Sequence, residues 1–204
     1  AEIVDAELEI WDQADGELTA SIALRKKLIG CIRAFAPDLI VTHRVADYHP
    51  DHRAAGQLVQ DSAYLLQVPS IAADFPAMHR MPAILLAFDR FQDPRPHRLD
   101  WVVDTKDHID TVLNMLACHQ TQVFEWLPKI MDMTVNADNK VGWLRKFYLA
   151  KPEAVAKAAK LAQTSDPSSE TADNADLAFA EAFEVSEYGG HFDPSDFNFV
   201  SKKN

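Results

Sequence analysis

The stretch PDLIVTHRVADYHPDHRAAG, residues 37–56, decides the fold that we expect. Residues 38–43 form a short apolar run with a polar tip, which is typical of a buried parallel strand. A helical pattern follows from Arg53 to Leu66, with apolar residues at three- and four-residue spacing. The polar residues between the two therefore lie after the C-terminal end of a strand and before a helix. Open α/β sheets place their functional groups at this position.

The rest of the chain continues the alternation of strands and helices. Helices are expected at residues 18–35, 53–66, 108–124 and, on the surface, 152–163, and strands at 1–10, 38–43, 83–88 and 101–104. Asp15-Gly16 predicts a turn, Ser21 or Thr19 a helix cap, and Pro37 a helix end. This order predicts an α/β chain with a Rossmann-like open, mainly parallel sheet and helices on both faces.

We expect one domain over residues 1–204. Residues 164–176 are polar and are expected to form a mobile loop, whereas 177–185 are apolar and should pack back onto the domain. Residues 192–204 are expected to form a loose C-terminal tail.

Composition excludes several classes of function. The net charge of −11 disfavours binding to a nucleic-acid backbone. No apolar run approaches the length of about 18 residues that a membrane-spanning helix needs, and no signal peptide opens the chain. Cys31 and Cys118 are expected to be buried free thiols, which suits a cytoplasmic location. Arg90 and Arg95, in a polar loop, are expected to be solvated.

Five side chains that can bind metals or transfer protons occur within ten residues: His43, Asp47, His49, Asp51 and His52. Imidazole and carboxylate are ligands that zinc takes, and catalytic zinc sites use three protein ligands and an open position. A histidine beside a carboxylate also serves as a general acid or base. The N-terminal end of the following helix stabilises an anion. The spacing alone therefore predicts a metal site or an acid–base site.

Four segments resemble the PIG-L/LmbE-like zinc-dependent N-deacetylases. The string PDLIVTHRVADYHPDHRAAGQLVQDSAYL is similar to the second signature of that family. The other similar segments are the acidic turn DQADGEL (12–18), VVDTKDHIDTVLNMLACHQTQ (102–122), with Thr121 in place of serine, and AEAFEVSEYG (180–189). The resemblance covers most of residues 10–190.

The resemblance implies a Rossmann-like fold, one Zn²⁺ ion and hydrolysis of an N-acetyl group from a small-molecule glucosamine-type conjugate. It implies that His52 is a zinc ligand. It implies that His49 stabilises the tetrahedral oxyanion or protonates the leaving amine, and that Asp51 hydrogen-bonds to His49 and orients it. His43 and Asp47 would support the pocket wall.

The chain departs from the family at its N-terminal end. Family members begin with a strand that ends in His-Pro-Asp-Asp and supplies two ligands and the general base, and no histidine precedes His43 here. Three explanations stay open: a fragment of a longer protein, a degenerate site, or completion by other residues, such as His119, or His191 with Asp193 and Asp196. We expect the first strand and first helix to be absent, this chain alone to have little activity, and an exposed sheet edge to permit homo-oligomers.

Two rival functions follow from the same residues. The chain is either a non-catalytic binding or scaffold protein that keeps the fold, or a different metal hydrolase that uses His43, His49, Asp51 and His52 alone. Substitution of His43 separates the second rival from the family interpretation, because only that rival needs His43 as a ligand.

Overall fold

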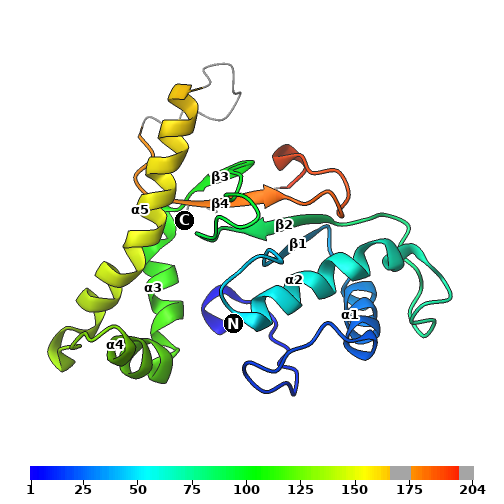
Figure 1. Cartoon of the computed structure of the whole chain (residues 1–204), viewed down its shortest axis with the longest axis horizontal. Coiled ribbons are helices and arrows are strands. Elements are labelled where there is room, and N and C mark those ends of the chain that lie inside the picture. The colour runs from blue at the N-terminus through cyan, green and yellow to red at the C-terminus, as the bar shows by residue number, and fades with distance from the viewer. Residues whose placement is uncertain (166–175, 198–204) are drawn as a thin grey trace. The chain divides into compact units, whose positions relative to one another are not determined.

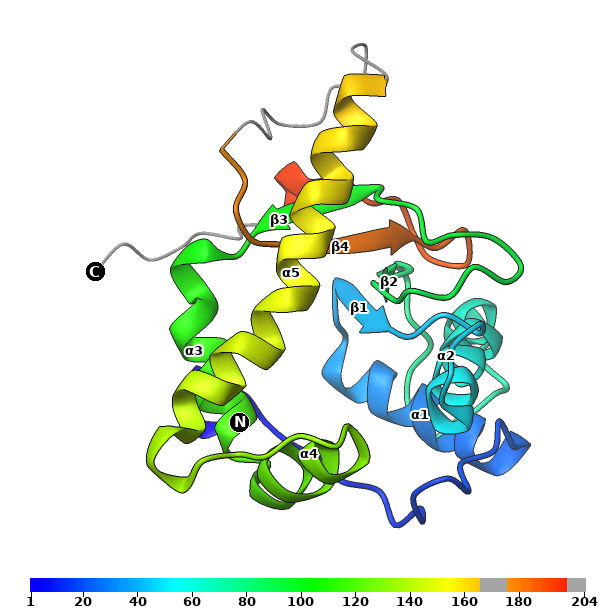
Figure 2. The same ribbon diagram turned by 60° about the vertical axis from the view of Figure 1, so that its left-hand side comes forward.

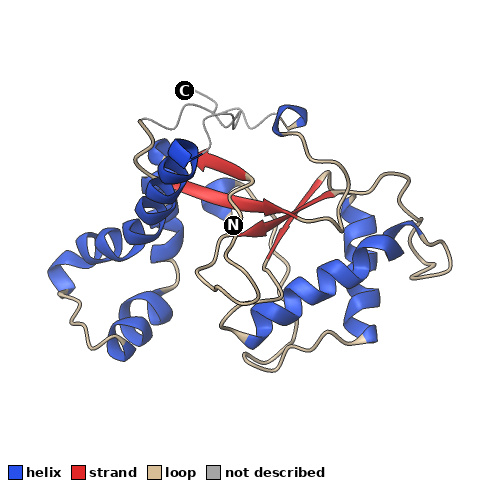
Figure 3. Cartoon of the chain, turned by 45° about the horizontal axis from the view of Figure 1, so that its top comes forward, coloured by secondary structure: helices blue, strands red, loops and turns tan. Residues whose placement is uncertain are grey.

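The computed structural model describes residues 1–165 and 176–197 and has the predicted α/β class. Its four strands are β1 (Leu39–Thr42), β2 (Ala83–Ala87), β3 (Trp101–Asp104) and β4 (Ala180–Val185), in the order β1-β2-β4-β3 (Figures 1 and 3). β1 and β2 pair in parallel, with Leu39 opposite Ala83. β2 and β4 pair antiparallel, with Leu86 opposite Glu184. The sheet is therefore mixed, and β1 lies at one edge.

The chain forms two compact units. The first, called the helical unit, combines Ala1–Trp11 with Val102–Ala182. The second, called the site unit, combines Asp12–Trp101 with the chain from Phe183 onward. All five side chains of the predicted site belong to the site unit. That the whole chain is one domain stays a prediction.

Helix α1 (Ile22–Phe35) opens the site unit with the predicted cap and stop. The hydroxyl of Ser21 accepts a hydrogen bond from the Leu24 N–H at 3.2 Å, and this bond satisfies one of the free donors of the first turn. The helix ends at Ala36, whose left-handed backbone (φ 52°) precedes Pro37. Ile29 and Ile32 face inward and pack with Leu66.

Helix α2 (Pro50–Ala63) packs against α1 and against the start of the sheet (Figure 1). Its buried residues Val59 and Ala63 contact Ile84 and Leu86 of β2. This burial of apolar surface holds α2 against the strands. Short 3₁₀ helices occur at Tyr64–Gln67 and Pro194–Asp196 in this unit.

The helical unit contains α3 (Ile109–Ala117), a π-helical turn (Gln122–Trp126), α4 (Leu127–Ile130) and α5 (Lys140–Ser165) (Figure 2). Short 3₁₀ helices lie at Glu2–Val4, Lys106–His108 and Ala137–Asn139. A core of Ile109, Leu113, Val123 and Leu144 holds α3, the π-helical turn and α5 together.

Several expectations for the helical unit were wrong. The helix expected at 108–124 ends at Ala117, and the helical backbone resumes at residue 120 and continues through the π-helical turn into α4. The expected surface helix 152–163 is the second half of α5, and its residues Pro152 and Val155 are fully buried. Residues 1–10 form no strand: Leu8 is 71% exposed and Ile10 83%, so the alternating pattern buries nothing.

Other expectations have mixed outcomes. Of the predicted mobile loop and loose tail, residues 166–175 and 198–204 lie outside the described part of the chain. Cys31 and Cys118 were both expected to be buried thiols, but Cys118 is exposed and Cys31 only half-buried. Within the described ranges, no helix has the length and apolar character needed to cross a bilayer.

Candidate metal and acid–base site

The candidate site forms where β1 ends and α2 begins. His43 directly follows β1, and His49 is the N-cap of α2, with its Nδ1 atom accepting a hydrogen bond from the Asp51 N–H at 3.3 Å. Gly56 lets α2 approach the strand end closely, because a Cβ atom there would lie 2.5 Å from the carbonyl oxygen of His43. Local sequence and this close approach together bring the predicted residues into one place.

His43, Asp47 and His52 form one cluster of possible metal ligands. One ligand atom from each lies within 4.8 Å of the others. The rings of His43 and His52 are stacked, with centroids 4.0 Å apart. Asp47 is buried, and its Oδ1 atom lies 3.0 Å from Nδ1 of His52 and accepts the His49 N–H at 2.9 Å.

This donor set fits a metal ion. The contact with Asp47 involves Nδ1 of His52 and leaves Nε2 as the ring nitrogen that can bind a metal ion. Carboxylates orient metal-binding histidines in this way and increase their basicity. Imidazole and carboxylate groups suit a divalent transition metal. The cluster could therefore hold a metal ion, with Asp47 either as a ligand or as the group that orients His52.

Asp15, His49 and Asp51 form a second cluster, with ligand atoms again within 4.8 Å of one another. The carboxylate of Asp51 accepts the Gly16 N–H at 2.8 Å and the Leu18 N–H at 3.1 Å. Asp15 Oδ1 lies 3.8 Å from His49 Nε2. The expected contact of Asp51 with His49 is made by the backbone N–H of Asp51, whereas its carboxylate holds the turn at Asp15-Gly16.

Asp15 was missed as a neighbour of His49, although its turn was predicted. The glycine is the sequence signal for this turn, because Gly16 adopts φ 85°, a left-handed conformation that glycine adopts readily. This turn brings Asp15 to the N-terminal end of α2. Only a contact between positions 16 and 51, far apart in the chain, reveals the arrangement.

The residues proposed to complete the metal site lie elsewhere or in the other unit. His191 lines a cavity of about 330 Å³ together with Asp38 and Ala83, which lie at the starts of β1 and β2. His43 lies at the opposite end of β1. His119 is an exposed residue of the helical unit. Among the described residues, neither cluster of possible metal ligands includes His119 or His191.

Arg44, next to His43, attaches a loop to the end of β1. Its buried guanidinium bonds both carboxylate oxygens of Asp89, at 2.6 and 2.7 Å. It also donates to the carbonyl oxygens of Phe91 and Arg95, at 2.9 and 3.0 Å. Bidentate pairs of this kind are geometrically specific. Arg44 thus fixes the loop from Asp89 to Arg95 beside the candidate site.

Comparison with known proteins finds a family match in the N-terminal part of the chain and solved structures with a similar fold. The family PIG-L: GlcNAc-PI de-N-acetylase matches residues 1–63, which include both clusters. No curated protein matches the chain in sequence.

Similar solved structures include the following three. N,N'-diacetylchitobiose deacetylase from Pyrococcus horikoshii, complexed with its inhibitor MPG, has a TM-score of 0.62 and 18% identity, over 92% of this chain and 60% of that chain. GalB, the 4-carboxy-2-hydroxymuconate hydratase from Pseudomonas putida, has a TM-score of 0.60 and 16% identity, over 90% and 66%. The conserved protein TT1542 from Thermus thermophilus has a TM-score of 0.57 and 18% identity, over 89% and 66%.

At these identities the similarity concerns the fold, and the chain spans 60% of the length of the deacetylase. The predicted resemblance is nevertheless confirmed by two independent findings. Residues 1–63 match the PIG-L family, and the chain has an α/β fold similar to that of a deacetylase of known structure.

Proposed function

We propose that this chain carries the site of a zinc-dependent hydrolase that removes an N-acetyl group from a glucosamine-type conjugate. The observation that carries the proposal is the contact between Asp47 and His52, with His43 beside them, inside the segment that matches the PIG-L family. The fold alone does not carry it, because a hydratase has a similar fold.

His52 is the proposed metal ligand, through Nε2. Asp47 orients its ring, and His43 stacks on the ring from the end of β1. A bound zinc ion lowers the pKa of its water to about 7 and polarises a carbonyl group. The location at the start of α2 adds the positive end of the helix dipole, which stabilises developing negative charge.

His49 is the proposed proton donor to the oxyanion or the leaving amine. Its Nδ1 atom accepts the N–H of Asp51, so the neutral ring carries its proton on Nε2. This assignment follows from the hydrogen bond. Nε2 is also the atom that faces Asp15. A fixed N–H group that stabilises a developing oxyanion is effective because it needs no reorganisation during the reaction.

The first test is the metal content of the chain. We expect one zinc ion per chain after reconstitution, lost in His52→Ala and retained in His108→Ala, a control at an exposed histidine of the helical unit. Release of acetate from N,N'-diacetylchitobiose is then measured on the same samples. Absence of stoichiometric zinc in the unsubstituted chain would overturn metal binding by this chain alone, as expected for part of a longer deacetylase or for a scaffold protein. Zinc lost equally in His43→Ala would favour the hydrolase that uses His43 as a ligand.

A further inference from the structure

A cavity of about 330 Å³, called the Asp38 cavity, lies at the start of β1 and β2. Asp38 directly precedes β1 and Ala83 is the first residue of β2, whereas His43 follows the last residue of β1. At about 3.3 Å per residue, the backbone from Asp38 to His43 spans roughly 17 Å. All lining residues belong to the site unit. The Asp38 cavity is therefore separate from the candidate metal and acid–base site.

Backbone contacts fix two walls of the Asp38 cavity. The Gly190 N–H donates to the carbonyl oxygen of Pro82 at 2.8 Å, and a Cβ atom on Gly190 would collide with the carbonyl oxygen of Met81. This close approach brings His191 into the wall. Arg33 also lines the cavity, but its guanidinium already donates to six carbonyl oxygens, so none of its N–H groups remains for a ligand.

Two oppositely charged side chains line the Asp38 cavity without a partner. They are Arg80 and Asp38, and both are exposed. Neither side chain forms an ion pair or a hydrogen bond with any residue in 1–165 or 176–197. A guanidinium and a carboxylate are thus both available to a ligand in this cavity.

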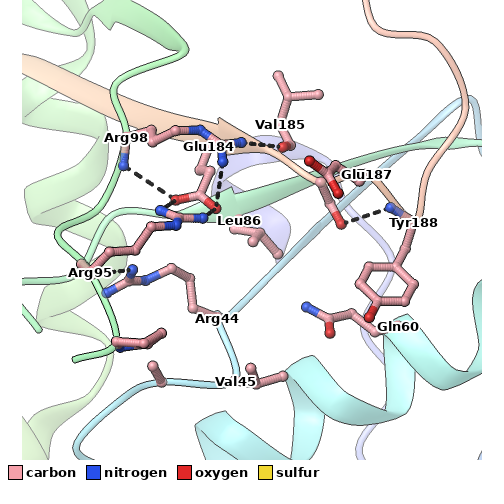
Figure 4. Close-up of a pocket in the computed structure, with 13 residues that line it drawn as sticks. Arg44, Val45, Gln60, Leu86, Arg95, Arg98, Glu184, Val185, Glu187 and Tyr188 are labelled. Carbon is pink, nitrogen blue, oxygen red and sulfur yellow. Dashed lines mark hydrogen bonds and ion pairs between the residues drawn. The ribbon is translucent and has the colours of Figure 1, made fainter. Parts of the chain in front are cut away.

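The guanidinium groups of another cavity, of about 410 Å³ beside Arg44, are by contrast paired. Both oxygens of the buried Glu184 accept hydrogen bonds from Arg95, one at 2.8 Å, and the Arg98 N–H donates to it at 3.2 Å (Figure 4). Burial by itself would raise the pKa of Glu184, but the hydrogen bonds from Arg95 and Arg98 lower it to about 2. A charged ligand there would compete with partners already in place, whereas in the Asp38 cavity it would not.

Apolar side chains supply the rest of the wall of the Asp38 cavity. Met78 and Met81 line it and pack against the core of α1, which holds them in place. Phe197 lines it as well and stacks on Phe192, with ring centroids 5.4 Å apart. Methionine side chains adapt to apolar groups of different shape. The volume of the cavity lies in the range of small-molecule sites.

We propose that the Asp38 cavity binds a free α-amino acid with an apolar side chain. Arg80 pairs with the carboxylate of the ligand and Asp38 with its ammonium group, and the apolar side chain lies against Met78, Met81 and Phe197. Asp38 repels a ligand that carries only a negative charge, and Arg80 repels one that carries only a positive charge. A ligand with both charges is therefore favoured. This binding site is independent of the proposed function.

The test is direct binding of three matched probes to the full chain by isothermal titration calorimetry. L-phenylalanine carries both charges, 3-phenylpropionate lacks the ammonium group, and 2-phenylethylamine lacks the carboxylate. We expect L-phenylalanine to bind at least about tenfold tighter than either of the others, since each lost charge removes one charge-assisted hydrogen bond. NMR titration should show shifts at the amides of Arg80 and Met81 and none at His43. Equal or tighter binding of a probe with one charge, binding of none of the three, or shifts at His43 instead would overturn the proposal.

Two variants assign the two charges, and both change exposed side chains, so the core stays intact. Asp38→Asn should weaken L-phenylalanine binding at least about tenfold without weakening that of 3-phenylpropionate. Arg80→Gln should weaken L-phenylalanine binding to a similar extent without weakening that of 2-phenylethylamine. Asp74→Asn, at an exposed carboxylate outside the wall, is the control and should bind as the unsubstituted chain does. His52→Ala should also bind normally, which separates this site from the metal site. Unchanged binding in Asp38→Asn and Arg80→Gln would refute the proposal.

Discussion

Asp47 Oδ1 lies 3.0 Å from Nδ1 of His52, and the carboxylate of Asp47 is buried. The same oxygen accepts the backbone N–H of His49. One buried acceptor thus orients the proposed metal ligand and fixes the N-cap residue of α2.

This relationship predicts that Asp47→Ala weakens zinc binding by ~10–100-fold, as loss of a carboxylate behind a metal-binding histidine does. Zinc affinity is measured by competition with a chromophoric chelator. Asp61→Ala on α2, whose carboxylate contacts Arg25 and Gln57, is the matched control and should keep its affinity. Unchanged affinity in folded Asp47→Ala would limit Asp47 to a structural role.

The contact of Asp51 with the turn at Gly16 predicts a local effect. Asp51→Ala removes the acceptor of the Gly16 and Leu18 N–H groups, so we expect faster hydrogen exchange at these two amides. The hydrogen bond to His49 should persist, because the backbone N–H of Asp51 makes it. The hydrogen-exchange rates of both amides are measured by NMR in the two proteins. Unchanged protection at both amides would contradict this assignment.

The hydrogen bonds of Arg33 predict that its substitution strongly lowers the stability of the fold. Its buried guanidinium donates to six backbone carbonyl oxygens of residues 65–75, which include the end of the 3₁₀ helix after α2. A lysine cannot reproduce this planar fork of donors. We expect Arg33→Lys to lower the free energy of unfolding by about 2–4 kcal/mol, since several buried acceptors lose partners.

Urea denaturation with Lys26→Arg as control measures this loss, because Lys26 is an exposed residue of the same helix. A change below about 0.5 kcal/mol, the range of ordinary surface substitutions, would show that the carbonyl groups find other donors.

Glu184 predicts a pH dependence of stability. Its pKa falls from the ordinary 4.5 to about 2 in the folded chain, so the ionised form stabilises the fold above about pH 4.5. This stabilisation is lost as the pH falls from 4.5 towards 2. We expect Glu184→Gln to lack this part of the decline in the free energy of unfolding. Urea titrations at pH 5.5, 4.5, 3.5 and 2.5 compare the slopes. Parallel slopes in the two proteins would refute the prediction.

Local patterns predicted the site unit well. The strand predicted at 38–43 is present at 39–42, the helix predicted at 53–66 is present at 50–63, and Ser21 is one of the two caps considered. These features follow from apolar spacing and from residues that start or stop helices, which act over a few positions. The same reasoning failed at residues 1–10. An alternating pattern forms a strand only when a partner strand and a buried face exist, and Leu8 and Ile10 have no buried face.

The sequence by itself determined the class of fold and the concentration of His43, Asp47, His49, Asp51 and His52 at one junction of a strand with a helix. The tertiary structure decided which of these side chains meet: Asp47 contacts His52, whereas Asp51 contacts a turn 33–35 residues away. It also decided that Arg95, expected to be solvated, pairs with Glu184 across 89 residues. Such contacts depend on how distant segments pack, and no pattern within a short stretch of sequence encodes them.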